Sequence, residues 1–240
     1  GRQETYWRET DLEAISAWQA GGGLFGLCSG RPPMGLFHLL PDKISPDFYI
    51  ACSGAAVFDR NRDVICEAVI EKEDVRELLG RYGPSVLFAA FHTDSPDALY
   101  RSRNTGRMGV KEVLVTSPED LGDRKLYSLS LIFDHEREAE EACRQINESC
   151  PALEAFQNKN SADVVRKGCS KGRGILLVKQ KMGVEVMAAI GDSFNDLPMF
   201  EAASHSFTFH GSPEKIRSRV TQVVDSVAEA LGWLSDSLCL

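Results

Sequence analysis

Short apolar runs separated by polar, glycine-containing turns mark both ends of the chain. The runs at 24–28, 49–52, 184–190 and 206–209 are apolar and rich enough in β-branched or aromatic residues to predict buried strands. Apolar residues at helical spacing predict helices at 10–20, 171–182, 197–203, 213–220 and 226–234. Strands that alternate with helices are typical of an α/β fold built on a parallel sheet.

The pattern changes in the middle of the chain. Strands are predicted at 64–69, 86–91, 113–115 and 126–133, a strand pair within 152–165, and helices at 73–81, 96–103 and 136–147. Leucine alternates with tyrosine and serine from Leu126 onward, which is the period of a half-buried strand. Residues 64–162 are therefore predicted to form an inserted α+β domain, while residues 1–63 and 163–240 form the surrounding core.

Two helices carry residues typical of helix ends. Thr10 is followed three residues later by Glu13, which is the spacing of a capping box, and the glycines at 21–23 end the same helix. Ser170 precedes the helix at 171–182 and is predicted to be its N-cap. Residues 1–9 are polar and show no strand pattern.

Composition and charge narrow the possible partners. The 240 residues carry a formal net charge of −8, which argues against nucleic acid because proteins that bind it present a basic face. No apolar run approaches the ~18 residues of a membrane span, and no signal peptide opens the chain. Seven cysteines without a C-x-x-C pair predict reduced thiols in a cytoplasmic protein. The oligomeric state has no signature in the sequence.

The most informative polar stretch is Gly-Asp-Ser-Phe-Asn-Asp, directly after the strand at 184–190. Open α/β sheets bind ligands at the carboxyl ends of their strands, where this turn lies. Asp192 and Asp196 are close enough in sequence to converge on one cation, and carboxylate oxygens suit Mg²⁺. The alternative is an aspartate-rich turn whose side chains cap the next helix.

Two further stretches supply groups suited to an anion. Ser29, Gly30 and Arg31 follow the apolar run at 24–28, so a hydroxyl and a backbone amide can reach a phosphate or a carboxylate. Lys171 lies in the first turn of its helix, where a cation is unfavourable unless it meets an anion. An ordinary turn and a solvated lysine are the alternatives for these two stretches.

Taken together, these motifs resemble those of the haloacid dehalogenase (HAD) superfamily, specifically its Cof-type (subfamily IIB) phosphatases. The resemblance implies a Rossmann-like HAD core with a parallel sheet and an α+β cap inserted between the second and third motifs. It also implies a Mg²⁺-dependent phosphatase for small phosphorylated metabolites, sugar phosphates in particular. The implied catalytic residues are Ser29, Lys171 and Asp192; the implied phosphate- or substrate-binding residues are Ser29, Gly30, Arg31, Lys171 and Asn195; the implied metal residues are Asp192 and Asp196.

One expected motif is missing from the chain. The superfamily's nucleophile, which forms an aspartyl-phosphate, lies in a D-x-D-G-T motif at the end of its first strand, and residues 1–9 contain no aspartate. We expect the nucleophile to lie upstream of Gly1, so that the chain by itself has little activity. Ser53-Gly54 stands where the family has Asn-Gly. The alternative to a phosphatase is a non-catalytic protein that binds or senses a phosphorylated metabolite on the same scaffold.

Overall fold

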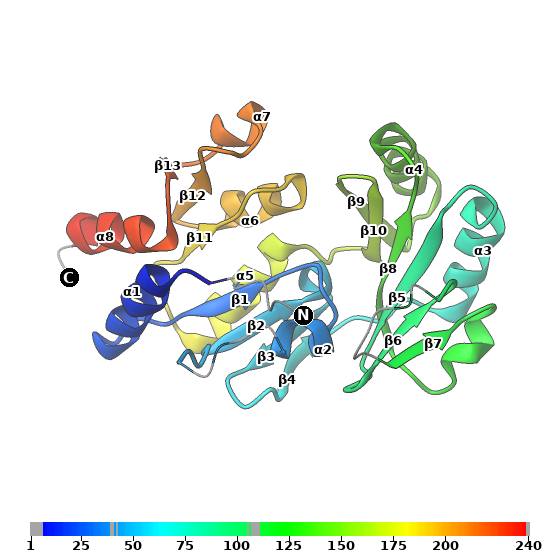
Figure 1. The fold of residues 1–240 in the computed structure, drawn as a ribbon, viewed down its shortest axis with the longest axis horizontal. Helices are drawn as coiled ribbons and strands as arrows, with labels where there is room; N and C mark the ends of the chain where they lie inside the picture. Colours follow the sequence, from blue (N-terminus) through cyan, green and yellow to red (C-terminus); the bar gives the residue numbers. More distant parts are fainter. Residues whose placement is uncertain (1–6, 39–40, 42, 105, 107–110, 239–240) are drawn as a thin grey trace.

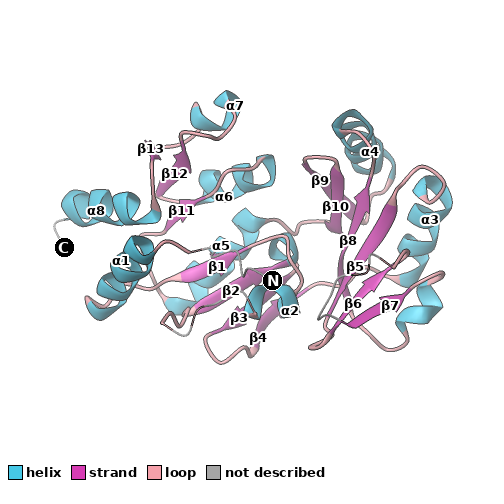
Figure 2. Cartoon of the chain, in the orientation of Figure 1, coloured by secondary structure: helices cyan, strands magenta, loops and turns pink. Residues whose placement is uncertain are grey.

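A computed structural model describes residues 7–38, 41, 43–104, 106 and 111–238. Strands and helices gather in two parts that lie side by side, the core on the left of Figure 1 and the cap on the right. Figure 2 shows that both parts combine sheet and helix, which confirms the predicted α/β class.

Two short sheets form the core part. Their strand orders are β1-β2-β3-β4 and β11-β12-β13. Strands β1 and β2 are parallel, as are the three strands of the second sheet, whereas β3 and β4 run antiparallel to their neighbours. The bounds are Gly26–Cys28 (β1), Phe48–Ala51 (β2), Ala56–Asp59 (β3), Val64–Glu67 (β4), Ala188–Ile190 (β11), His205–Phe209 (β12) and Gln222–Val224 (β13).

The core helices are Glu9–Ala20 (α1), Pro33–Phe37 (α2), Lys171–Met182 (α5), Leu197–Ala202 (α6), Glu214–Arg217 (α7) and Val227–Leu238 (α8). One buried cluster joins the two sheets through α5, because Ile50 of β2, Ile175 of α5 and Ala189 of β11 all belong to it. No helix in the described part of the chain is both long and apolar enough to cross a membrane.

Each core sheet ends in a strand with one unpaired side. Among the described strands, β1 pairs only with β2, and β11 pairs only with β12. Cys28 of β1 and Ala189 of β11 nevertheless contact the same buried cluster. The parallel part of the core is therefore interrupted between β1 and β11, and the carboxyl ends of both strands lead to the same region of the molecule.

The two predicted helix caps have different outcomes. The Thr10 cap is wrong: α1 begins at Glu9 after Arg8, without a side-chain cap. The Ser170 cap is confirmed, since its hydroxyl accepts a hydrogen bond of 3.1 Å from the backbone N–H of Arg173. The start of α8 has a side-chain acceptor that was not predicted from the sequence. Asp11 of α1 accepts a 2.9 Å hydrogen bond from the backbone N–H of Ala228, in the first turn of α8.

The cap contains one six-stranded sheet of order β7-β6-β5-β8-β10-β9 with two helices. The bounds are Lys72–Tyr82 (α3), Phe88–Thr93 (β5), Ala98–Arg101 (β6), Lys111–Leu114 (β7), Leu126–Ile132 (β8), Glu136–Ser149 (α4), Leu153–Asn158 (β9) and Ser161–Arg166 (β10). The helix predicted at 96–103 is wrong, because these residues contribute β6, which hydrogen-bonds to β5 and β7. Pairing on both sides satisfies the backbone groups and outweighs local helix propensity.

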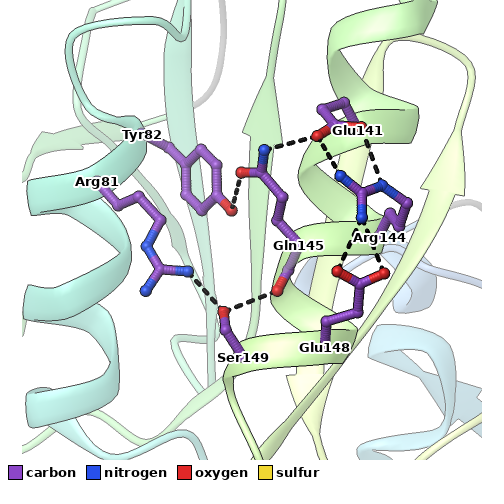
Figure 3. A network of polar contacts seen from close by, with 7 residues as sticks. All are labelled: Arg81, Tyr82, Glu141, Arg144, Gln145, Glu148 and Ser149. Carbon is purple, nitrogen blue, oxygen red and sulfur yellow. Dashed lines mark hydrogen bonds and ion pairs between the residues drawn. The ribbon is translucent and has the colours of Figure 1, made fainter.

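Helices α3 and α4 are joined by polar contacts on the outside of the cap (Figure 3). Arg81 donates to the hydroxyl of Ser149 at 2.7 Å, and the Tyr82 hydroxyl donates to Gln145 at 3.2 Å. Arg144 pairs with two glutamates of its own helix. Exposed ion pairs of this kind contribute about 0–1 kcal/mol each, so the buried residues between helices and sheet carry most of the cap's stability.

The chain passes between core and cap at two neighbouring linkers. Strand β4 belongs to a core sheet and β10 extends to Arg166 in the cap sheet, so we propose boundaries at 68–71 and 167–170 in place of those predicted at 63/64 and 162/163. The Arg166 guanidinium donates to the carbonyl of Val69 at 3.3 Å and to Glu71 at 3.2 Å. Glu67, at the end of β4, accepts a 2.8 Å hydrogen bond from Tyr127 of the cap.

Candidate active site

The carboxyl ends of β1 and β11 and the start of α5 meet at a cavity between core and cap. Its volume is about 910 Å³. All seven residues singled out from the sequence line it: Ser29, Gly30, Arg31, Lys171, Asp192, Asn195 and Asp196. The structure therefore brings together residues that are up to 167 positions apart, while their individual chemical roles stay predictions.

Lys171 lies inside this cavity as a buried cation. Its side chain is 8% exposed, and its ammonium group donates to Asp196 at 2.5 Å and to the amide oxygen of Asn195 at 3.1 Å. Burial alone would lower the pKa of Lys171, but the charge and the hydrogen bond of Asp196, together with the charge of Asp163 and the nearby Cys28, outweigh burial, so the pKa is raised. The side chain is therefore charged at neutral pH even though it is buried. The alternative of a solvated surface lysine does not fit this burial.

Asp196 orders the turn that follows β11. One of its carboxylate oxygens accepts from Lys171, and the other accepts from the backbone N–H groups of Asp192 and Ser193, both at 2.9 Å. Gly191 makes this possible, because a Cβ at that position would lie 2.5 Å from Cγ of Asp196. Both oxygens of Asp196 are thus engaged within the protein, and its contribution to a metal site stays a prediction.

Asp192 differs from Asp196 in its surroundings. It lines the cavity, and among the described residues no hydrogen bond or ion pair engages its carboxylate. Mg²⁺ in proteins is held by one or two carboxylates together with substrate phosphate and water, so a carboxylate without a protein partner at a cavity fits this ion. In the described part of the chain, no three or more histidine, cysteine, aspartate or glutamate side chains are arranged so that together they could hold a metal ion.

The turns after β1 and β2 hold each other in place. Ser29 donates its N–H to Ile50, its carbonyl accepts from Ser53 at 3.1 Å, and its hydroxyl accepts from the N–H of Arg31 at 3.2 Å. The Ser29 hydroxyl proton is therefore free to be donated to a ligand. Cys52 and Ser53 are in the left-handed backbone region, with φ of 49° and 53°, and strained residues of this kind cluster at ligand sites.

Several cap residues at the cavity were not assigned a role from the sequence, which for His92 favoured a strand-end turn over a polar pocket. His92 of β5 hydrogen-bonds to Ser128 of β8 at 2.9 Å, and burial lowers the pKa of its imidazole. Asp163 of β10 is 6% exposed and accepts from Ser130 at 2.6 Å. The signal that could have found Ser130 is the leucine–serine alternation of β8, whose polar side reaches the cavity at this residue.

Comparison with known proteins agrees with the motifs. A family model described as haloacid dehalogenase-like hydrolase matches residues 2–232. A 5-amino-6-(5-phospho-D-ribitylamino)uracil phosphatase of Bacillus subtilis is 23% identical over 246 residues, covering 89% of this chain and 85% of that protein.

Solved structures show the same fold. A HAD subclass IIB sugar phosphatase superposes with a TM-score of 0.79 at 20% identity, covering 97% of this chain and 92% of that chain. A phosphatase of the same superfamily from Bacteroides thetaiotaomicron gives a TM-score of 0.78 at 24% identity, covering 97% and 88%. The resemblance inferred from the glycine–aspartate turn is confirmed along nearly the whole chain, which belongs to the haloacid dehalogenase-like hydrolase family.

Proposed function

We propose that this chain forms the phosphate- and metal-binding part of a Mg²⁺-dependent phosphatase that acts on small phosphorylated metabolites, sugar phosphates in particular. The observation that carries the proposal is the meeting of Ser29, Lys171 and Asp192 at one cavity. The similar fold of a solved sugar phosphatase supports the choice of sugar phosphates.

The residues at the cavity supply what phosphoryl transfer needs, which is positioning and neutralisation of charge. The Ser29 hydroxyl and the Gly30 N–H donate to phosphoryl oxygens, and Arg31 contacts the phosphate at the rim. The Lys171 ammonium neutralises charge on the phosphoryl group while Asp196 holds it in place. The Asn195 amide, whose oxygen already accepts from Lys171, presents its N–H₂ group to the ligand.

A magnesium ion would be held by Asp192, with the turn around it fixed by Asp196. When bound, the ion supplies positive charge that stabilises the oxygens of the phosphoryl group. Lys171, held by Asp196, carries a second positive charge, so the negative charge of a phosphate ester is offset even though the whole chain is acidic.

The nucleophile in this proposal is an aspartate on a strand upstream of Gly1 that lies between β1 and β11. Its carboxylate attacks phosphorus, the bond from phosphorus to the ester oxygen breaks, and the second aspartate of the D-x-D motif gives its proton to the leaving alcohol. The same aspartate then takes a proton from the water that hydrolyses the aspartyl-phosphate, which releases inorganic phosphate and restores both carboxyl groups. The unpaired sides of β1 and β11 support this placement. A second cavity of about 440 Å³ also borders β1, where Leu27 and Cys28 line it together with Phe209 of β12.

The test compares phosphate release from a panel of sugar phosphates by this chain and by a chain extended upstream through an aspartate-containing strand. We expect turnover with MgCl₂ only from the extended chain. Asp192→Asn in the extended chain should abolish Mg²⁺-dependent turnover, whereas Asp134→Asn, an exposed cap carboxylate, should not. Turnover by the short chain would contradict the role given to the upstream strand, and an extended chain that binds phosphate esters without turnover would favour a non-catalytic binding protein.

A further inference from the structure

The side of the cap sheet that faces the core carries a row of polar residues. On β8, Leu129 and Leu131 belong to the cap's buried cluster together with residues of α3 and α4, which lie on the other side of the sheet (Figure 1). Ser130, between them, lines the cavity, and its neighbour across the ladder on β10 is Asp163. Strand alternation therefore places the Asp163 carboxylate on the side of the cap sheet that faces the core turn containing Ser29, Gly30 and Arg31.

The two oxygens of Asp163 have different surroundings. Oδ1 accepts hydrogen bonds from Ser130 at 2.6 Å and from Ser161 at 2.9 Å. Oδ2 has only the Asn158 amide, at a long 3.4 Å. No ion pair among the described residues involves Asp163; hydroxyl and amide groups donate to it, and its negative charge also helps to raise the pKa of Lys171. A carboxylate oxygen offers two acceptor sites, which leaves Oδ2 able to accept from a ligand.

Oδ2 of Asp163 is directed toward a small space above Gly30. A Cβ placed on Gly30 would lie 3.5 Å from this oxygen, 3.4 Å from the hydroxyl of Ser53 and 3.9 Å from the amide nitrogen of Asn195. Ser53 is 2% exposed, and its hydroxyl has no hydrogen-bond partner among the described residues. A buried hydroxyl without a hydrogen-bond partner lowers the stability of the fold by about 1–3 kcal/mol. A polar ligand group that enters this space could therefore form hydrogen bonds with protein groups that lack partners.

We propose that Asp163 selects substrates that carry a hydroxyl group on the carbons next to the phosphate ester. This inference rests on the proposed function, because it takes the phosphate to lie on Ser29, Gly30 and Lys171. A carboxylate accepts hydrogen bonds and donates none, so Oδ2 favours an O–H group beside the phosphate and repels a second anionic group there. Substrates with a carboxylate close to the phosphate are therefore rejected.

Binding of four phosphate compounds to the 240-residue chain tests the inference by calorimetry in excess MgCl₂. The probes are inorganic phosphate, propyl phosphate, glycerol 1-phosphate and 3-phosphoglycerate. We expect glycerol 1-phosphate to bind about 10-fold more tightly than propyl phosphate, the size of one good hydrogen bond to a charged group. 3-Phosphoglycerate should bind more weakly than either ester.

Asp163→Asn should reduce the preference for glycerol 1-phosphate below about 3-fold and should strengthen binding of 3-phosphoglycerate, because the repulsion is removed. Inorganic phosphate should bind this variant at least as tightly as it binds the natural chain. Asp97→Asn, which removes another carboxylate that lines the cavity, is the matched control and should leave the preference in place. Asp163→Glu keeps the charge but displaces it, so it should weaken the preference while still rejecting 3-phosphoglycerate.

The outcomes separate the two proposals. Equal binding of glycerol 1-phosphate and propyl phosphate, with inorganic phosphate bound, would overturn the role of Asp163 and leave the proposed function standing. A preference that survives in both Asp163 variants would overturn it as well. If neither the 240-residue chain nor the chain extended upstream through an aspartate-containing strand binds any of the four compounds, the proposed function fails and this inference fails with it.

Discussion

Replacement of Lys171 by methionine should destabilise the core by an amount typical of a broken buried ion pair. The partner carboxylate, Asp196, has a side chain only 5% exposed and would be left with its two backbone N–H donors. Removal of one member of a buried pair costs about 3–5 kcal/mol, against about 0–1 kcal/mol for an exposed pair. Because the two N–H donors still stabilise the carboxylate, we expect a loss of about 3 kcal/mol.

The double variant Lys171→Met/Asp196→Asn separates the pair from simple loss of packing. Since it leaves no uncompensated charge, its cost should be at least about 1 kcal/mol smaller than the sum of the two single costs. Urea unfolding followed by tryptophan fluorescence reports on the core, because the three tryptophans are Trp7, Trp18 and Trp233. Additive single costs, or a loss below about 1 kcal/mol for Lys171→Met, would refute the reasoning.

The same pair predicts a dependence on pH. The folded-state pKa of Lys171 is raised above the ordinary lysine value of 10.5, so its contribution to stability is fully present below pH 10.5. That contribution is lost as the pH rises through the folded-state pKa. The natural chain should therefore lose stability above pH 10.5 more steeply than Lys171→Met does, as measured by urea midpoints across the alkaline range.

Three further perturbations test other parts of the structure. Gly191→Ala should weaken binding of inorganic phosphate at least tenfold by calorimetry, because its Cβ would meet the Asp196 carboxylate; unchanged binding would show that the turn can shift. Asp11→Ala should lower the free energy of unfolding, measured in urea, by about 1 kcal/mol, because the Ala228 N–H at the start of α8 loses its acceptor. An unchanged free energy of unfolding would show that this hydrogen bond does not stabilise α8. Burial raises the pKa of Cys52 to about 12, so iodoacetamide at pH 8 should leave this thiol unmodified in the folded protein, as read by mass spectrometry; rapid labelling would show that the site opens.

The site was predictable because parallel strands bring their carboxyl ends to one rim. Turns after the runs at 24–28 and 184–190 therefore had to lie close together, and the lysine of a following helix could join them. The sequence did not separate Asp192 from Asp196, since the spacing of the two aspartates is equally compatible with metal binding and with ordering of the turn. Only the hydrogen bonds of Asp196 distinguish these roles.

The errors arose where long-range pairing outweighs local preference. Residues 98–101 have the composition of a helix but are enclosed by two strands. The run at 184–190 forms a ladder only from Ala188 to Ile190, because only these residues lie opposite β12. The cap residues at the cavity were missed since alternation predicts a polar face but not whether water or another part of the protein covers it. Residues 1–9 were predicted to form no strand. For residues 1–6 this stays a prediction, because they lie outside the described residues.

The paired linkers at 68–71 and 167–170 restrict how the cap can move. Arg166 connects them directly, and Tyr127 connects the cap to Glu67 beside the first linker. Because both linkers attach the cap to the core, the cap could rotate about the line that joins the two linkers but would resist rotation about any other axis. With the cap held in this way, Asp163 meets the space above Gly30 in one orientation, so the carbon chain and the phosphate of a ligand would be recognised together.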